Sequence, residues 1–314
     1  MAMAANVSQP LVFEPLFMER VWGGRRLESL FGKSLPVATR IGESWELVDR
    51  PEAQSVVHDG PLRGETLHNL WINGRAEIFG NVPDAPRFPI LVKLLDAREK
   101  LSVQVHPPAD KADDLGGEPK TEFWYIADAD PAAELYVGLT SDSSRGKFAA
   151  AIEQGAVEEQ VHRIRVKSGD AMFLPSGRVH AIGGGNVIVE IQQNSDTTYR
   201  VFDWDRTDRE LHIEQSLHCI DFNDIEPSLI EPAGESLLRD ELFHVEKWTL
   251  DQPRDAADRE RFAIICCTSG TVECTGVEIR AGNLLLVPAA LEKAIVTPAA
   301  AGSEILRVTS GAPR

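Results

Sequence analysis

VKSGDAMFLPSGRVHAI, residues 166–182, recurs without a gap as IRAGNLLLVPAALEKAI, residues 279–295. The two segments carry a glycine at the same place, Gly169 in the first and Gly282 in the second. Self-similarity at this distance along a chain marks a repeated structural unit. The repeat therefore predicts two copies of one barrel in tandem.

Short strand-like segments surround the first copy of the repeat. They are rich in β-branched and aromatic residues and are separated by Gly, Pro, Asp or Ser, a pattern typical of a sandwich or jelly roll. These segments are FPILVKLLDA (88–97), KLSVQVHPP (100–108), TEFWYIADA (121–129), AELYVGLT (133–140), HRIRVKSGD (162–170), AMFLPSG (171–177) and NVIVEIQQNS (186–195). Helices are predicted over residues 64–79 and 143–162. We expect a mainly β chain with a few short helices.

Composition narrows the class of protein. The chain has 314 residues, of which 43% are hydrophobic and 26% charged, enough for one large or two moderate globular domains. It contains no long apolar run and no signal-like start, so we expect a soluble, cytoplasmic protein. The four cysteines show no metal-binding or disulfide spacing and are expected to be buried thiols.

The net charge of −17 disfavours nucleic acid and anionic membranes as partners. An anionic substrate would need a local cluster of lysine and arginine inside its pocket. The chain also lacks a P-loop, a dinucleotide glycine fingerprint and a nucleophile elbow, which disfavours nucleotide-driven chemistry.

LSVQVHPP, residues 101–108, places Gln104 and His106 two apart on a strand, so both side chains leave the same face. Val103 and Val105 then point to the opposite face. A single histidine on the inner face of a barrel is more often a packed core residue than a ligand, so this pair alone does not establish a metal site.

Two further residues change that interpretation. Glu122 opens the strand TEFWYI, where a carboxylate entering an aromatic run is costly unless it is paired or bound to a metal. His180 follows the turn FLPSGRVH on a strand that can return across the same barrel. Two imidazoles, a carboxylate and an amide suit zinc, and also iron, manganese or cobalt. The sequence predicts one divalent-metal site made by Gln104, His106, Glu122 and His180.

Charged residues accompany these ligands. Lys120, two positions before Glu122, is expected on the same side and close to the metal. Alternation along residues 186–193 aims Glu190 at a face with polar neighbours. Beyond the turn at Asp196, Arg200 lies among aromatic residues near the barrel mouth. The charged residues that follow are Asp205, Arg206 and Arg209. They are as consistent with a solvated surface loop as with a functional role.

The repeat also predicts how the chain divides. DIEPSLIEPAGESLL, residues 224–238, has the proline, glycine and acidic character of a linker. We expect residues 1–223 to form a metal-binding catalytic domain with helical additions and residues 239–314 a second barrel. His180 aligns with Lys293, so the second barrel is expected to be metal-free, with a structural or interface role.

Four motifs, in this order, resemble type I mannose-6-phosphate isomerases: LSVQVHPP, PKTEFWYI, LPSGRVHAIGGG and VEIQQNSDTTYRVFDWDR. The opening FMERVWGGRRL resembles the N-terminal signature of that family. The resemblance spans about residues 11–215, and the C-terminal part matches only in outline. The chain lacks the large helical insertion of the eukaryotic and enteric members between the Glu122 and His180 motifs, and so looks like the short bacterial form.

This resemblance implies two cupin (double-stranded β-helix) barrels, a zinc ion on the four predicted ligands, and reversible conversion of mannose 6-phosphate to fructose 6-phosphate. By position it implies a substrate pocket lined by Lys120, Glu190, Asp196 and Arg200. We hypothesise that Arg200 and Lys120 supply positive charge near the developing oxyanion or the phosphate. Glu190 or Asp196 would move the proton, or one of them would only orient Arg200. The expected partner is a phosphosugar, and the expected state is a monomer or homodimer.

Two alternatives remain open at this stage. Two imidazoles and a carboxylate also describe the facial triad of non-haem iron oxygenases, which share this barrel. A sugar-phosphate-binding protein without turnover is the second alternative. The positive charge of Lys120 and Arg200 favours an anionic sugar over the oxygenase, and the intact set of pocket residues disfavours a non-catalytic protein.

Overall fold

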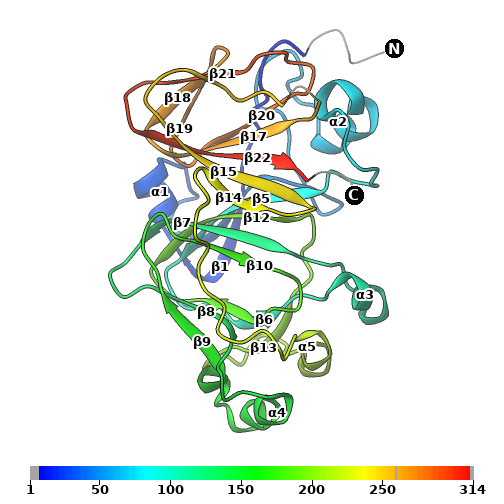
Figure 1. Ribbon diagram of the computed structural model, residues 1–314, viewed down its shortest axis with the longest axis vertical. Coiled ribbons are helices and arrows are strands. Elements are labelled where there is room, and N and C mark those ends of the chain that lie inside the picture. The colour runs from blue at the N-terminus through cyan, green and yellow to red at the C-terminus, as the bar shows by residue number, and fades with distance from the viewer. Residues whose placement is uncertain (1–6, 259, 312–314) are drawn as a thin grey trace.

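The computed structural model describes residues 7–258 and 260–311 and consists mainly of β-strands, arranged as two barrels stacked one above the other (Figure 1). The first barrel has a six-stranded and a five-stranded sheet. The larger sheet contains, in spatial order, β1 (Leu16–Gly24), β2 (Ile41–Leu47), β5 (Ile90–Ala97), β12 (Asn186–Gln193), β7 (Glu122–Ala129) and β10 (Ala171–Leu174). The smaller contains β13 (Tyr199–Phe202), β6 (Val103–Val105), β11 (His180–Ile182), β8 (Glu134–Leu139) and β9 (Val161–Arg165).

The second barrel is built from a five-stranded and a four-stranded sheet. The first of these contains β14 (Ser236–Arg239), β15 (Phe243–Leu250), β22 (Ser303–Ser310), β17 (Ala263–Ser269) and β20 (Leu284–Val287). The other contains β16 (Arg254–Asp255), β21 (Ile295–Pro298), β18 (Thr271–Cys274) and β19 (Val277–Arg280). A small hairpin, β3 (Asp49–Arg50) with β4 (Ala53–Gln54), lies outside both barrels.

The two barrels share one strand order, which confirms the tandem duplication predicted from the repeat. The order β5-β12-β7-β10 recurs as β15-β22-β17-β20, and β6-β11-β8-β9 recurs as β16-β21-β18-β19. Strands β10 and β20 occupy matched positions of the repeated sequence. All the segments predicted to be strands in the first copy contain a strand.

Helices are short and lie at the edges of the barrels. They are α1 (Arg26–Phe31), α2 (Leu67–Asn73), α3 (Ala109–Ala112), α4 (Arg145–Gln154) and α5 (Ile213–Cys219), with a π-turn at Arg75–Phe79 and 3₁₀ turns at Asp113–Leu115 and Val157–Gln160. No helix in residues 7–258 and 260–311 is both long and apolar enough to cross a bilayer.

The predicted helix over residues 143–162 is too long. Ser144 caps α4 as expected by accepting a hydrogen bond from the Lys147 amide. The helix stops at Gln154 because Gly155 adopts a left-handed conformation, with φ of 69°. His162 then belongs to β9, not to the helix.

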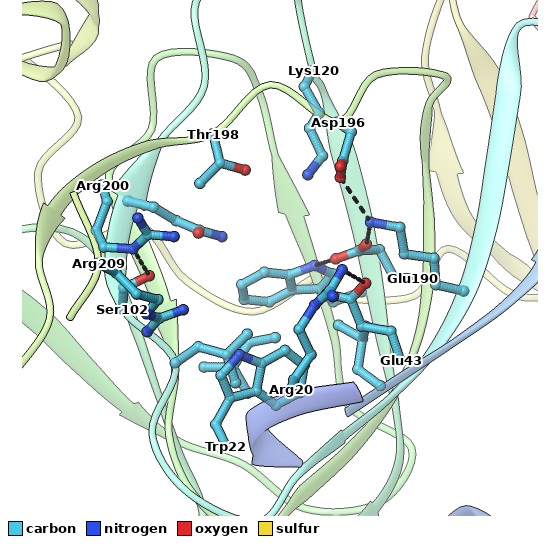
Figure 2. Close-up of a pocket in the computed structure, with 16 residues that line it drawn as sticks. Arg20, Trp22, Glu43, Ser102, Lys120, Glu190, Asp196, Thr198, Arg200 and Arg209 are labelled. Atoms are coloured by element: carbon cyan, nitrogen blue, oxygen red, sulfur yellow. Dashed lines mark hydrogen bonds and ion pairs between the residues drawn. The ribbon is translucent and has the colours of Figure 1, made fainter. Parts of the chain in front are cut away.

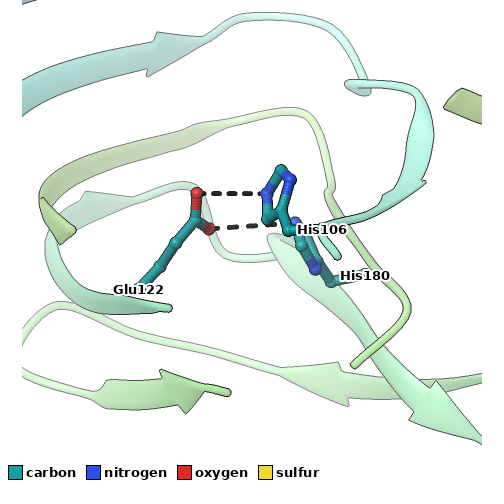
Figure 3. A group of neighbouring side chains, drawn as sticks. All are labelled: His106, Glu122 and His180. Atoms are coloured by element: carbon teal, nitrogen blue, oxygen red, sulfur yellow. Dashed lines mark ion pairs between the residues drawn. The ribbon is translucent and has the colours of Figure 1, made fainter. Parts of the chain in front are cut away.

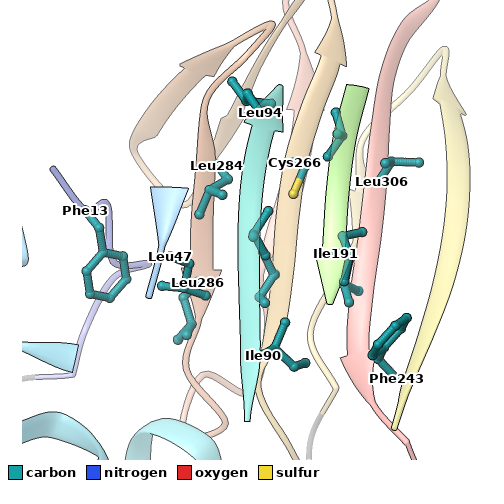
Figure 4. Close-up of a cluster of buried hydrophobic side chains, with 14 of the residues drawn as sticks. Phe13, Leu47, Ile90, Leu94, Ile191, Phe243, Cys266, Leu284, Leu286 and Leu306 are labelled. Atoms are coloured by element: carbon teal, nitrogen blue, oxygen red, sulfur yellow. The ribbon is translucent and has the colours of Figure 1, made fainter. Parts of the chain in front are cut away.

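The main hydrophobic core lies between the two barrels rather than inside either of them. Val187, Val189 and Ile191 of β12 face Leu306 and Val308 of β22 in one buried cluster (Figure 4). Alternation sends the other face of β12 into the first barrel, where Ile188 packs and Glu190 lines a pocket. Strand β12 therefore joins the inter-barrel core to the chemistry of the first barrel.

The predicted linker contacts both barrels. The Ile230 amide donates to the Ala171 carbonyl of the first barrel, and β14 of the second barrel begins at Ser236. At the other end of the chain, Leu11 pairs with Leu286 of the second barrel. The proposed division into residues 1–223, 224–238 and 239–314 remains a prediction, and the two units it describes share the core just described.

Candidate metal centre and active-site pocket

His106, Glu122 and His180 converge inside the first barrel, each with 1% of its surface exposed (Figure 3). His106 directly follows β6, His180 opens β11 opposite Gln104, and Glu122 is the first residue of β7. One ligand atom from each of the three lies within 4.8 Å of the others. Glu122 Oε1 is 3.2 Å from His106 Nε2, and Oε2 is 3.8 Å from His180 Nε2. The structure thus brings together three of the predicted ligands.

The backbone fixes both imidazole rings. His106 Nδ1 lies 2.8 Å from the Thr197 carbonyl and His180 Nδ1 lies 2.9 Å from the Arg178 carbonyl, so both Nδ1 atoms act as donors. The Nε2 atoms are then left with lone pairs facing Glu122, the arrangement that metal-binding histidines require. Burial, and then the charge of Lys120, lowers the pKa of His106 to about 3. Burial also lowers the pKa of His180. Both rings are therefore neutral at pH 7.

Three potential ligand atoms of this cluster lack a hydrogen-bond partner among the described residues, and a bound cation would satisfy them. His106 Nε2 and both carboxylate oxygens of Glu122 are fully buried, yet none forms a hydrogen bond of acceptable geometry with a described residue. Both imidazoles carry their proton on Nδ1, so neither directs a proton at Glu122, whose only close cationic neighbour among the described residues is Lys120. Unmet buried polar atoms are costly, and neutral imidazoles with a carboxylate suit a divalent metal. The residues present therefore fit a metal ion.

Gln104 lies at the same place, with its Nε2 atom 3.3 Å from His180 Nε2. Exchanging the two ends of the amide brings Oε1 to that position without moving the side chain. Because an amide oxygen is a metal ligand and an amide nitrogen is not, a bound metal would select this orientation. The geometry is compatible with Gln104 as a fourth ligand, which remains a prediction.

A pocket of about 430 Å³ opens beside the cluster (Figure 2). It is lined by Lys120, Glu190, Asp196 and Arg200, the four residues predicted for substrate contact, and also by Gln104. The sequence-based set therefore shares one cavity, and the roles of its members remain predictions.

Lys120 lies between the cluster and the pocket. Its Nζ atom is 3.0 Å from Glu122 Oε1, and only 4% of the residue is exposed. Burial alone would lower the pKa of Lys120, but the negative charges of Glu122 and Glu190 outweigh burial and raise it. Burial likewise opposes ionisation of Glu122, while Lys120 and the imidazoles hold the pKa of Glu122 well below its usual value. Lys120 is therefore a buried cation and Glu122 a buried anion.

Glu190 is the pocket carboxyl with the most strongly raised pKa. Burial, and then the negative charge of Glu122, raises the pKa of Glu190 to about 7. Glu190 Oε2 accepts a hydrogen bond of 2.9 Å from the Trp124 indole, and Oε1 lies 3.5 Å from Lys93 Nζ. A carboxyl held in this way is fixed in position and titrates near neutral pH.

Asp196 and Arg200 lie in different surroundings. The Asp196 side chain is 44% exposed and reaches 3.9 Å from Lys93. Arg200 donates to Ser102 Oγ at 3.3 Å and to the Glu210 carbonyl at 2.8 Å. Neither carboxylate, Glu190 or Asp196, forms an ion pair with Arg200 in the described part of the chain. The possibility that one of them serves only to orient Arg200 therefore finds no support in the geometry.

Several pocket residues were missed from the sequence. They are Arg20, Glu43, Lys93, Ser102, Thr198 and Arg209. Lys93 carried a usable signal, because a lysine in the apolar run FPILVKLLDA must find a buried partner. Arg209 carried none, because its placement depends on Asp203, a fully buried carboxylate that accepts hydrogen bonds from both Arg206 and Arg209. Of the charged residues that follow Arg200, Arg209 is therefore held in place as part of the pocket wall.

Two chain segments that carry pocket residues lie side by side. Residues 118–121 lead to Glu122, and residues 193–197 include Asp196. The Gln193 amide donates to the Thr121 carbonyl at 3.0 Å, and Ser195 Oγ donates to the Glu118 carbonyl at 3.2 Å.

Arg50 clamps these two segments from outside, because it donates to Glu118 Oε2 at 2.7 Å and to the Asn194 carbonyl at 2.9 Å. We predict that Arg50→Ala lowers kcat about tenfold and changes KM less than about threefold, because pocket groups shift by a fraction of an ångström. Arg50→Lys should recover part of the loss. Steady-state kinetics on both variants tests this, with Arg40→Ala, which removes an exposed arginine paired with Glu99, as the matched control. A fall in thermal stability with unchanged kcat would show a purely structural role.

Comparisons with known proteins identify the family of this chain. Residues 11–151 match the sequence model of the phosphomannose isomerase type I catalytic domain. A probable mannose-6-phosphate isomerase of Bacillus subtilis, GmuF, is 38% identical over 301 residues, which covers 90% of this chain and 94% of the relative. Mannose-6-phosphate isomerase ManA of the same organism is 38% identical, covering 84% of this chain and 86% of the relative.

Solved structures agree as well. The crystal structure of a mannose 6-phosphate isomerase from Bacillus subtilis superposes with a TM-score of 0.84 at 32% identity, covering 96% of this chain and 99% of that one. A putative mannosephosphate isomerase from Archaeoglobus fulgidus shares the fold, with a TM-score of 0.81 at 21% identity over 98% and 99% of the two chains. The likeness to GmuF and ManA extends over both barrels. This chain belongs to the type I phosphomannose isomerase family.

Proposed function

We propose that this chain interconverts mannose 6-phosphate and fructose 6-phosphate, the reaction for which its relatives are named. The observation that carries the proposal is the shared cavity, where a buried cluster suited to a metal adjoins a carboxyl with a raised pKa and a group of cations. Aldose–ketose isomerisation needs those parts, namely a base near neutral pH and positive charge near the developing oxyanion.

The proposed metal is zinc, held by Gln104, His106, Glu122 and His180. Neutral imidazoles and a carboxylate in a buried site favour zinc over magnesium or calcium, which prefer more oxygen ligands. When bound, zinc would supply Lewis acidity at the O1/O2 end of the sugar. Lys120, beside the ligand Glu122, would add a fixed positive charge at the same end.

The phosphate of the substrate would lie against the wall of the pocket that carries Arg200 and Arg209. Figure 2 shows Arg200 and Arg209 with Ser102 on one wall, facing Glu190 and Glu43 across the cavity. Asp203 takes up one positive charge from the pair Arg206 and Arg209, so this wall keeps a net positive charge with Arg200. A chain with a net charge of −17 needs a local cluster of positive charge to bind an anion, and this wall provides one.

Glu190 is the group best placed to move the proton. We infer that its carboxylate takes the proton from C2 of the aldose and returns it to C1, while the proton of the O2 hydroxyl passes to O1, and the two transfers together yield the ketose. The Trp124 indole and Lys93 fix the carboxylate, and its raised pKa places it near the working pH. Asp196, more exposed and only distantly paired with Lys93, would instead contact sugar hydroxyls.

The pH dependence of kcat/KM follows from this assignment. A base must be deprotonated, so activity should fall as the pH drops through the pKa of Glu190, which is about 7 in the metal-free protein. Bound zinc offsets the negative charge of Glu122, a contributor to that raised pKa, so the acidic limb of the zinc enzyme should lie below 7. A kcat/KM profile of the zinc-loaded enzyme checks this. A limb centred above 7 would contradict the assignment.

The function is tested by fructose 6-phosphate formation from mannose 6-phosphate, in a coupled assay on metal-stripped protein before and after zinc is restored. Zinc-dependent turnover supports both the metal and the reaction. Full activity in the stripped protein, verified by metal analysis, would refute the metal-assisted scheme. Zinc binding without product would point to a sugar-phosphate-binding protein, and iron content with oxygen consumption would point to an oxygenase.

A further inference from the structure

The second barrel has a pocket of its own, about 150 Å³ in volume, between β14, β15, β22 and the segment that precedes β17. Its charged lining consists of Arg239, His244, Glu246, Asp258, Arg261 and Arg307. It is separate from the active-site pocket, with which it shares no lining residue. Nothing in the isomerisation uses these side chains.

The internal repeat shows where this pocket lies relative to the metal centre. Leu174 pairs with Glu122 in the first barrel, and Val287, the repeat counterpart of Leu174, pairs with Ala263 in the second. Ala263 therefore stands where the first barrel has its metal-binding carboxylate. Arg261, two residues before Ala263, then corresponds to Lys120, two residues before Glu122. The second pocket therefore has no counterpart of the Glu122 carboxylate, but Arg261 keeps the positive charge of Lys120.

The ion pair beside the metal centre is inverted in the second barrel. Glu190 pairs across the sheet with Lys93 and with Trp124. At the matched place Arg307 pairs with Glu246 and with Ile265. An arginine has thus replaced the glutamate that we assign as the base, and its carboxylate partner, Glu246, holds it at 2.9 Å. This exchange moves positive charge onto the strand that carries the base in the first barrel.

Most guanidinium donors of the second pocket are engaged, since Arg261 Nη1 donates to the Ser310 carbonyl at 3.1 Å and Arg307 Nε donates to the Ala256 carbonyl at 2.9 Å, but two donor groups are left over. Glu246 is engaged by Arg307, and Asp258 lies 3.4 Å from Arg261. The guanidinium of Arg239 forms no hydrogen bond or ion pair with any residue in 7–258 or 260–311. The Nε atom of Arg261 is buried and has no acceptor in the same ranges. Burial, followed by the charges of Arg261 and Arg239, lowers the pKa of His244, while Asp240 and Glu246 act in the opposite direction.

We propose that this pocket binds a phosphate group, either as free inorganic phosphate or as the phosphate of a small metabolite. Its volume accommodates a phosphate but not a whole hexose phosphate, so any organic part would extend into solvent. Arg239, Arg261 and His244, which all line the pocket, are donors of the kind that recognise phosphate. The site would bind phosphate independently of the active-site pocket, with which it shares no lining residue.

The test uses the full-length, zinc-loaded protein and inorganic phosphate as the probe. The Arg200→Ala variant weakens anion binding in the active-site pocket, so isothermal titration in that background reports mainly the second pocket. We expect about one phosphate per chain, with a Kd weakened at least about tenfold by a further Arg239→Ser substitution, because one charge-assisted contact is lost. Arg239→Lys should retain part of the affinity.

The matched control is Arg254→Ser, which removes a half-buried arginine of the same barrel that is paired with Glu235, stacks on Trp248 and lies outside the pocket. It should leave the Kd within about twofold, because the net charge changes equally but no pocket donor is lost. Competition by glycerol 3-phosphate would show that phosphate esters are accepted, and its failure would assign the site to free phosphate. No phosphate binding in the Arg200→Ala background, or equal loss in Arg239→Ser and Arg254→Ser, would overturn the proposal.

Discussion

Replacing His180 by alanine is expected to abolish stoichiometric zinc binding and to lower kcat/KM by about a thousandfold or more, because loss of one of few ligands opens the site and removes its Lewis acid. His180 is 1% exposed and held by the Arg178 carbonyl, so its substitution removes a ligand that is fixed in place inside the cluster. The measurements are metal content per chain and turnover of mannose 6-phosphate with added zinc.

His162→Ala is the matched control, because this histidine lies on β9 of the same barrel and outside the pocket. A readout of folding separates metal loss from general damage. Zinc should raise the thermal midpoint of the metal-stripped parent protein, since a ligand that binds only the folded state stabilises it. Adding zinc should not change the thermal midpoint of the His180→Ala variant. Unchanged activity and unchanged zinc content in His180→Ala would remove this residue from the site.

The metal cluster was predictable because strand alternation is a strong local rule. Gln104 and His106 share a face of β6, and Val103 and Val105 pack on the other side with no exposed surface. Glu122 stood out as a carboxylate at the start of an aromatic strand. The contact between His106 and His180, more than seventy residues apart, follows only once β11 pairs with β6. Alternation within one strand cannot supply that pairing. It is inferred from the position of His180 after a turn, on a strand that can return across the same barrel, and the resemblance of the motifs to a known family implies the same ligands.

The charged walls of the pocket were less predictable because they depend on pairings between distant segments. Lys93 is 3% exposed, in a strand that reads as plain apolar core, and only the structure shows that Glu190 and Asp196 lie near it. The position of Arg209 is set by the buried Asp203, and a sequence gives no means to tell such a carboxylate from a solvated one. Local propensity also cannot foresee that the largest core would form between the barrels.

The choice between Glu190 and Asp196, which the sequence left open, can be decided by a pair of isosteric substitutions. Glu190→Gln should lower kcat by about 10²- to 10⁴-fold, the usual contribution of a general base, while KM changes little. Glutamine can still accept the Trp124 hydrogen bond, so the side chain should stay in place. Asp196→Asn should lower kcat by about tenfold or less, because a group that contacts sugar hydroxyls contributes mainly to binding.

Deuterium incorporation from heavy water separates proton transfer from binding in these variants. In Glu190→Gln, exchange of the C2 hydrogen of mannose 6-phosphate should slow in step with kcat, whereas in Asp196→Asn it should persist. A larger loss of exchange in Asp196→Asn would reverse the assignment. It would mean that Lys93, which lies within 4 Å of both carboxylates, serves Asp196 and that the raised pKa of Glu190 plays no part in the proton transfer. Because the two variants remove the same charge from the same cavity, electrostatic loss cannot by itself explain a difference between them.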